Sequence, residues 1–188
     1  MKLLLLIMLV FTSIFAIEEK MIEVEIKNNV EHVLNTLKTN KSDKEKQEII
    51  ISKIETLFDF NTMAKISIGK KWGSMNEDEK IRFMEKFTDK LKLSFFEKLQ
   101  LYSNEKVEYL PLEKNKDSRI LLKTFIVSSK NNDKSEVIYK FYKNDKNEWY
   151  IYDVDIIGVS LVQSYRTQIA DLLAKNNDDI NILFTSLK

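Results

Sequence analysis

The 188-residue sequence contains no cysteine and only one proline, three glycines and one histidine. Without cysteine, the chain has no disulfide framework, no thiolate metal site and no cysteine-linked lipid anchor. Three glycines leave little material for loops that hold nucleotide phosphates, and no P-loop or dinucleotide fingerprint occurs. His32 stands alone on a predicted helix. We therefore expect a surface residue, and neither a zinc site nor a Ser–His–acid triad.

An excess of charge of one sign is also lacking. The sequence has 30 basic and 29 acidic residues, and the two signs are interspersed along the chain. Bulk electrostatics therefore do not favour a nucleic-acid partner, and the charges indicate a solvated surface.

One long apolar run is present, and it lies at the N-terminus, "MKLLLLIMLVFTSIFA". Lys2 supplies a positive charge, residues 3–11 are apolar, and Ala16 is a small residue at a plausible cleavage point. This pattern predicts a secretory signal peptide over residues 1–16, because the run is short for a membrane-spanning helix. The alternative is an uncleaved anchor. Residues 17–188 then form one exported, soluble domain that is large enough for a core of its own.

Helical periodicity dominates both ends of the mature chain. Ser42 with Glu45, and Ser74 with Glu77, match the capping-box pattern at two helix starts. Gly69 is a natural C-terminal stop for a short helix that begins at Asp59 or Asn61. Helices are predicted over residues 18–39, 76–101, 159–174 and 178–187. Between the first two, one helix is predicted to start at residue 42 and a separate short helix to end at residue 69.

After the single proline the apolar period changes from 3.6 to 2. The segments "RILLKTFIVSS", "SEVIYKFYK" and "EWYIYDVDI" read as strands, and a weaker strand covers residues 107–110. Short polar connections predict antiparallel hairpins. The expected fold is α+β: N-terminal helices packed on a curved antiparallel meander of about four strands, followed by C-terminal helices. The strand at 119–127 is apolar on both faces, so the sheet is either covered twice or encloses a cavity.

Asp153 and Asp155 are the best catalytic candidates. Two residues apart on one strand, their carboxylates share a face, where coupling raises one pKa and creates a general base. In the alternative interpretation, which we favour, Asp155 pairs with Arg166 and Asp153 pairs with a lysine of the neighbouring strand. No other component of an active site accompanies them.

Two segments resemble a known family. "FDFNTMAKISIGKKWGSMNEDEKIRFMEKF" and "YDVDIIGVSLVQSYRTQIADLL" are similar, in order and spacing, to the two signatures of the MlaC (toluene-tolerance) family of periplasmic phospholipid-binding proteins. Trp72, Gly158 and Arg166 match the family pattern. Asn176 and Asn177 stand where the family often has glycine, and asparagine tolerates the left-handed backbone that such a turn needs.

The resemblance implies a soluble periplasmic carrier without catalytic activity or cofactor. Such a carrier moves phospholipid between an outer-membrane complex and an inner-membrane ABC transporter, which it contacts transiently, as a monomer. The acyl tails then lie in an apolar cavity between the helices and the sheet. The residues expected to line it are Phe60, Phe87, Leu91, Phe95, Tyr139, Phe141, Tyr152, Val154 and Val159. Tyr165 and Arg166 are expected near its mouth, close to the headgroup.

Two alternatives to this interpretation stay open. The lining residues are equally compatible with ordinary core packing, which pattern does not separate from a cavity. The chain is then an exported adaptor with a solid core, or a small isomerase or hydratase that uses Asp153 or Asp155 as its base.

Overall fold

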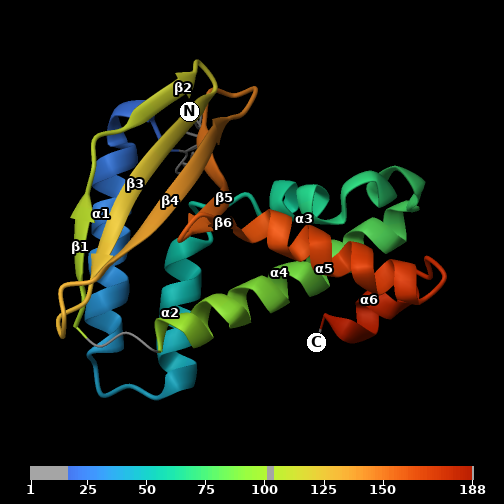
Figure 1. The fold of residues 1–188 in the computed structure, drawn as a ribbon, viewed down its shortest axis with the longest axis horizontal. Helices are drawn as coiled ribbons and strands as arrows, with labels where there is room; N and C mark the ends of the chain where they lie inside the picture. Colours follow the sequence, from blue (N-terminus) through green and yellow to red (C-terminus); the bar gives the residue numbers. More distant parts are fainter. Residues whose placement is uncertain (1–16, 101–103, 188) are drawn as a thin grey trace, which may run out of the picture.

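The computed structural model describes residues 17–100 and 104–187, so the predicted signal peptide lies outside the described residues. Figure 1 shows a curved sheet with α1 against it, a bundle of α3, α4, α5 and α6 beside it, and α2 between the two. The helices are η1 (Glu19–Met21), α1 (Ile22–Leu37), α2 (Asp43–Ile54), α3 (Phe60–Ile68), η2 (Gly69–Ser74), α4 (Glu77–Leu99), α5 (Leu161–Lys175) and α6 (Asn181–Ser186). The strands are β1 (Lys106–Tyr109), β2 (Glu113–Lys116), β3 (Arg119–Val127), β4 (Lys134–Lys143), β5 (Trp149–Ile156) and β6 (Val159–Ser160).

The predicted boundaries of α2 and α3 are confirmed. Ser42 caps α2 in a capping box: its hydroxyl accepts from the Glu45 backbone N–H, and its own N–H donates to the Glu45 carboxylate. Asp59 caps α3, and Gly69 ends it with φ of 62°. Asn177, which replaces a glycine of the family pattern, also adopts a positive φ, 53°.

The predicted cap of the longest helix is wrong. Asn76 and Glu79 form the capping box of α4, two residues after the expected pair of Ser74 and Glu77. The Ser74 hydroxyl donates instead to the carbonyl of Lys71 and closes the preceding 3-10 turn. Asparagine caps a helix as well as serine does, so the spacing alone did not separate the two starts.

The described residues form an antiparallel sheet of six strands, not about four. Its order is β1-β3-β4-β5-β6, and β2 also pairs with β3. The two strands that the sequence did not predict are short. β2 is polar and fully exposed, and β6 has two residues, so neither shows the alternation that marks a strand.

A β-bulge in β5 reverses the direction of its side chains. Lys140 of β4 pairs with Asp153, while the next residue of β4 pairs with Ile151, so Tyr152 is the extra residue. Bulges of this kind place two consecutive side chains on one side. Ile151 and Val154 therefore pack in the same apolar cluster under α1, whereas Tyr152 and Asp153 lie on the opposite face.

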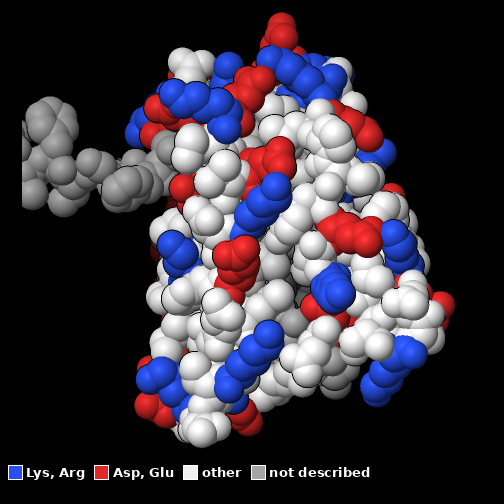
Figure 2. Space-filling model, turned by 90° about the vertical axis from the view of Figure 1, so that its left-hand side faces the viewer, with Lys and Arg blue, Asp and Glu red and all other residues white. Residues whose placement is uncertain are grey.

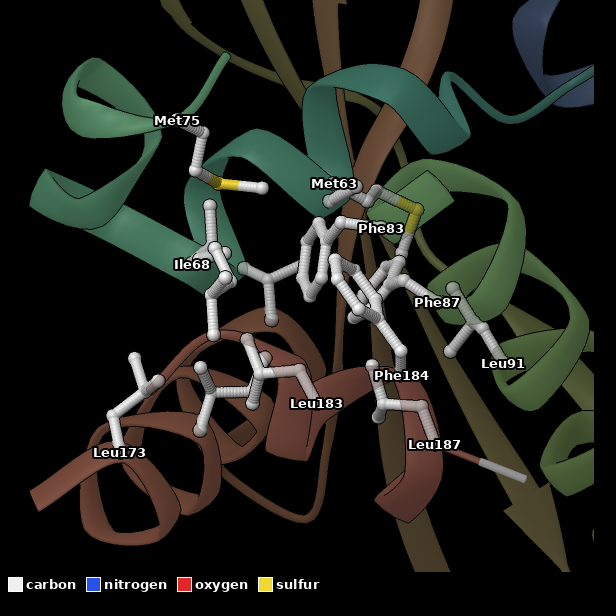
Figure 3. Close-up of a cluster of buried hydrophobic side chains, with 14 residues drawn as sticks. Met63, Ile68, Met75, Phe83, Phe87, Leu91, Leu173, Leu183, Phe184 and Leu187 are labelled. Carbon is white, nitrogen blue, oxygen red and sulfur yellow. The ribbon is translucent and has the colours of Figure 1, made fainter. Parts of the chain in front are cut away.

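Three apolar clusters make up the interior. The helical core (Figure 3) consists of Met63, Ala64, Ile68, Met75, Phe83, Phe87, Leu91, Val162, Ile169, Leu173, Ile180, Leu183, Phe184 and Leu187. The sheet core lies between α1 and the sheet and consists of Ile17, Ile22, Ile26, Leu57, Ile120, Leu122, Val137, Phe141, Trp149, Ile151 and Val154. The junction cluster joins α1, α2 and α4 through Val33, Ile50, Ile54 and Phe96. Phe58 packs against all three clusters.

The surface confirms the mixed charge pattern of the sequence. Figure 2 shows lysine, arginine, aspartate and glutamate interspersed with uncharged side chains on the face that carries α1 and β1. Within the described residues, several of these charges are paired across elements, for example Lys134 with Glu108 at 2.5 Å. No single sign dominates this face.

The β5–β6 turn has an unfavourable residue. Ile157 has φ of 51°, precedes Gly158 with φ of 75°, and is 67% exposed. A β-branched residue in this region is strained, and Asn-Gly is the preferred sequence of such a two-residue turn. We expect Ile157→Asn to raise the free energy of unfolding by about 1 kcal/mol, measured by urea denaturation.

Val159→Asn is the matched control for this substitution. Val159 is also an exposed aliphatic residue of the same hairpin, but it lies in an extended strand. The same chemical change should leave stability unchanged or lower it. Equal stabilisation by both substitutions would mean that removal of exposed apolar surface, and not relief of strain, is the cause.

Candidate functional site

The segment that precedes α3 is attached to β5 on the edge that faces away from β4. The Ile151 N–H donates to the Leu57 carbonyl at 2.8 Å, and the Asp59 N–H donates to the Ile151 carbonyl at 2.9 Å. Asp59 then accepts from the Thr62 N–H at 2.9 Å, which starts α3. These bonds hold Phe58, half-buried, at the meeting point of the three clusters.

A hollow of about 500 Å³ opens beside Phe58, between the start of α3 and the β4–β5 hairpin. This volume lies within the range of small-molecule sites. The rings of Phe58 and Phe60 stack at 5.7 Å between centroids, and those of Tyr142 and Tyr150 lie 6.5 Å apart. The lining comprises Phe58, Asp59, Phe60, Asn61, Thr88, Tyr142, Asn144, Lys146, Glu148 and Tyr150. This lining mixes rings with charged side chains, so the hollow is not the enclosed apolar cavity expected from the sequence. That cavity stays a prediction.

Two carboxylates in the hollow contact the tyrosine hydroxyls. The Tyr142 hydroxyl donates to Asp59, and the Tyr150 hydroxyl donates to Glu148 at 3.3 Å. Burial raises the pKa of both phenols, and the Asp59 and Glu148 carboxylates raise the pKa values further. Both tyrosines therefore stay protonated at any physiological pH.

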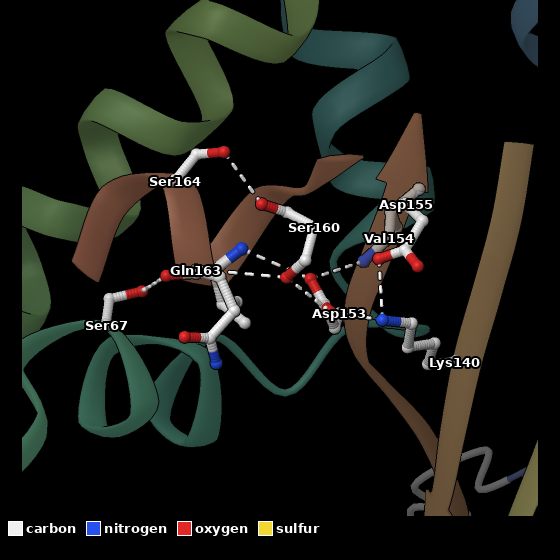
Figure 4. A network of polar contacts seen from close by, with 9 residues as sticks. Ser67, Lys140, Asp153, Val154, Asp155, Ser160, Gln163 and Ser164 are labelled. Carbon is white, nitrogen blue, oxygen red and sulfur yellow. Dashed lines mark hydrogen bonds and ion pairs between the residues drawn. The ribbon is translucent and has the colours of Figure 1, made fainter. Parts of the chain in front are cut away.

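The Asp153 carboxylate is the centre of a buried polar network (Figure 4). It is 3% exposed and accepts from the Val154 N–H at 2.9 Å, the Val162 N–H at 3.1 Å and the Ser160 hydroxyl at 2.7 Å. Lys140 of the neighbouring strand lies 3.0 Å away, so the predicted pairing of Asp153 with a lysine is confirmed. Since all these donors converge on one carboxylate, Asp153 joins the sheet to the first turn of α5.

The predicted pair of Asp155 with Arg166 is wrong. Asp155 pairs with the same Lys140, at 2.6 Å. Burial lowers the pKa of Lys140, but its bonds to Asp153 and Asp155 outweigh that effect and raise the pKa overall. Arg166 packs instead against Gly69 at the end of α3. Its Nε lies 3.0 Å from the position that a Cβ atom would take on that glycine. The turn at Ile157 and Gly158 and the short strand β6 separate Asp155 from α5, so alternation along β5 did not predict where Arg166 lies.

The residues predicted to line a cavity are spread over the molecule. Phe87 and Leu91 belong to the helical core (Figure 3), and Phe60 and Tyr165 pack against it. Phe141 and Val154 belong to the sheet core with Tyr139 beside them, and Phe95 packs against the junction cluster. Outside all three clusters lie Tyr152, Val159 and Arg166.

The positions of Tyr152 and Val159 differ from the expected interior ones. The bulge turns Tyr152 away from Val154, and its ring packs at 6.0 Å, edge-on, against Tyr142. Val159 is 58% exposed because β6 lies at the edge of the sheet. Strict alternation places Tyr152 and Val154 on one face, and the bulge removes that alternation.

Sequence reasoning missed Phe58, Tyr142 and Tyr150. The short polar connection "KNDKN" predicts the β4–β5 hairpin, and its register brings Tyr142 opposite Tyr150. That signal was available. The contact of Phe58 with this hairpin had no such signal in the sequence, because it depends on a pairing between residues 58 and 151.

A scan against family models gives the decisive comparison. Among the described residues, no helix is long and apolar enough to cross a membrane, and no group of histidine and acidic residues suits a metal ion. The model of the MlaC protein family matches residues 27–188. The chain belongs to the MlaC family. No curated protein sequence matches it.

A solved structure shares the fold of this MlaC-family chain. It is the phospholipid-binding protein from Ralstonia solanacearum in complex with a phospholipid, with 22% identity and a TM-score of 0.74. The match covers 87% of this chain and 93% of that chain. The likeness establishes the α+β architecture of helices and antiparallel sheet.

The Asp153 network leads to a stability prediction. Asp153→Asn replaces one acceptor oxygen by an NH₂ group that faces other donors, so we expect a loss of about 2–4 kcal/mol in the free energy of unfolding. Asp155→Asn leaves Lys140 paired with Asp153 and should cost about 1 kcal/mol or less. Urea denaturation of both variants measures the difference. The reverse order would contradict a structural role for Asp153.

Proposed function

We propose that this MlaC-family protein is a periplasmic phospholipid carrier that exchanges lipid with membrane complexes and catalyses no reaction. The observation that carries the proposal is the family match over residues 27–188, together with a structural relative described in complex with a phospholipid. The N-terminal pattern of a signal peptide supports export to the periplasm.

The physical need for a carrier follows from the hydrophobic effect. An acyl chain of ~16 methylenes at ~0.8 kcal/mol each costs ~13 kcal/mol in water. A two-chain lipid therefore does not cross an aqueous compartment unless its tails stay covered. Covering them requires apolar surface and no chemical step, and partners that accept or supply lipid then set the direction of transfer.

The tails are best accommodated between the sheet core and the junction cluster, beside Phe58. Val154 belongs to the sheet core, and Tyr139 packs against it. Burial raises the pKa of Tyr139 to about 12. Asn29 projects from the inner face of α1, is 4% exposed, and its Oδ1 has no hydrogen-bond partner among the described residues. A buried unpaired acceptor is unusual in a packed core and fits a region that receives a ligand.

The enzyme alternative has less support. A general base needs a free lone pair directed at a substrate proton. Asp153 accepts from four donors, and Asp155 is paired with Lys140. Neither residue lines the hollow beside Phe58. The partners we propose are an inner-membrane ABC transporter and an outer-membrane complex, each contacted transiently by a monomer.

Lipid extraction tests the proposal directly. Protein secreted to the periplasm and purified without detergent should release phospholipid on organic extraction, detected by mass spectrometry at about one molecule per chain. Folded protein that is free of lipid would refute the carrier function and favour an adaptor with a solid core.

Two valine substitutions locate the tails. Val154→Phe adds volume in the sheet core, and Val162→Phe adds the same volume in the helical core; the two side chains are 7% and 2% exposed. Each should cost about 1–3 kcal/mol of stability. We expect only Val154→Phe to lower the amount of co-purified lipid, by several-fold. Equal loss in both would place the tails elsewhere or show a general effect of destabilisation.

A further inference from the structure

The hollow beside Phe58 combines aromatic rings with carboxylates that lack a cationic partner. Phe60, Tyr142 and Tyr150 line it with Asp59 and Glu148. The ion pairs among the described residues include neither carboxylate. Among the described residues, no lysine or arginine therefore forms an ion pair with Asp59 or Glu148.

Neutral donors hold both carboxylates in place without neutralising them. Asp59 accepts from the N–H and hydroxyl of Thr62 and from the Tyr142 hydroxyl. Glu148 accepts from the Asn144 side-chain amide at 2.8 Å and from the Tyr150 hydroxyl. Such bonds fix the position of a carboxylate, while its charge stays available to a ligand.

The potential in the hollow favours a cation. Beyond the effect of burial, the Asp59 carboxylate raises the pKa of both Tyr142 and Tyr150, so its field reaches across the hollow. The faces of the aromatic rings carry the negative part of their quadrupole. Two of these rings already bind cations from outside the lining: Arg119 lies 5.5 Å from the Tyr142 centroid, and Lys92 lies 5.4 Å from that of Phe60.

We propose that this hollow binds an alkylammonium group, with the rings of Phe60, Tyr142 and Tyr150 around the cation and Asp59 and Glu148 as its counter-charges. Aromatic cages of this kind recognise quaternary ammonium ions. An ethanolamine or choline headgroup of a phospholipid and a free amine present the same chemistry. The volume of about 500 Å³ accommodates either.

An anion fits the site less well. The start of α3 would attract a phosphate, but Asp59 already occupies the Thr62 N–H of its first turn. Of the lining residues only Lys146 is cationic, and it is exposed at the tip of the β4–β5 hairpin. The fixed carboxylates of Asp59 and Glu148 would repel an anion bound in the hollow.

An NMR titration of the delipidated protein with choline chloride tests the site, with sodium chloride and sodium glycerophosphate as controls at equal ionic strength. Choline should shift the amide signals of residues 59–62 and 144–150, with half-saturation at ~10 mM or below. No shift of these signals with choline would overturn the proposal. So would equal shifts with glycerophosphate, which indicate an anion site.

Three variants assign the binding to the cage. Tyr150→Leu should weaken choline binding ~10-fold, because one ring face is lost. Glu148→Gln should weaken it ~3-fold, since the carboxylate is partly exposed. Phe125→Leu is the matched control: this ring lies on β3, has Lys134 5.6 Å from its centroid and is outside the lining, so affinity should not change. Loss of affinity in the control equal to that in Tyr150→Leu would contradict the assignment.

Lipid loading separates the two sources of the ammonium group. If a headgroup occupies the hollow, protein loaded with phosphatidylcholine should no longer respond to choline, while protein loaded with phosphatidylglycerol should respond. If both respond equally, the ligand is a free amine. The titration needs no bound lipid, so failure of the lipid-carrier function and failure of the ammonium site are distinguishable.

Discussion

The connection between the sheet and the helical bundle depends on one buried carboxylate. Asp153 lies in β5, pairs with Lys140 of β4, and accepts from the Ser160 hydroxyl and the Val162 N–H, where α5 begins. A buried carboxylate is costly unless every oxygen is hydrogen-bonded, and here the donors come from both halves of the molecule. Each half thus stabilises the arrangement of the other. The aspartates that first resemble catalytic groups are structural for this reason.

The second connection is made by backbone pairing and apolar packing where residues 57–59 meet β5. The backbone of residues 57–59 pairs with Ile151, and Phe58 inserts its ring where the helical core, the sheet core and the junction cluster meet. A ligand taken up between the sheet and the helices would lie beside this residue. The hollow with its tyrosines and carboxylates begins at the same ring. Phe58 therefore separates an apolar interior from a polar, aromatic opening.

Much of the fold could be predicted because it depends on local signals. The cap at Ser42, the stop at Gly69 and the long strands follow from the properties of neighbouring residues. The predicted start of α4 was wrong because Ser74 and Asn76 both fit the pattern of a helix cap. Other errors arose where a strand was too short or too polar to show a period, as with β2 and β6. The predicted lining stays a prediction, and the bulge at Tyr152 interrupts the strand alternation on which part of it depended.

The sequence by itself determined the α+β class, the lack of thiol ligands and the resemblance to the MlaC family, and it predicts an export signal. All of these depend on composition, or on residues close together in the chain. Only the tertiary structure decided that Lys140 serves both aspartates, that Arg166 lies against Gly69, and that Phe58 meets three clusters. These contacts join residues far apart in sequence, and the geometry of a bulge, a turn and a helix entry decides which of them meet. No periodic pattern encodes that geometry.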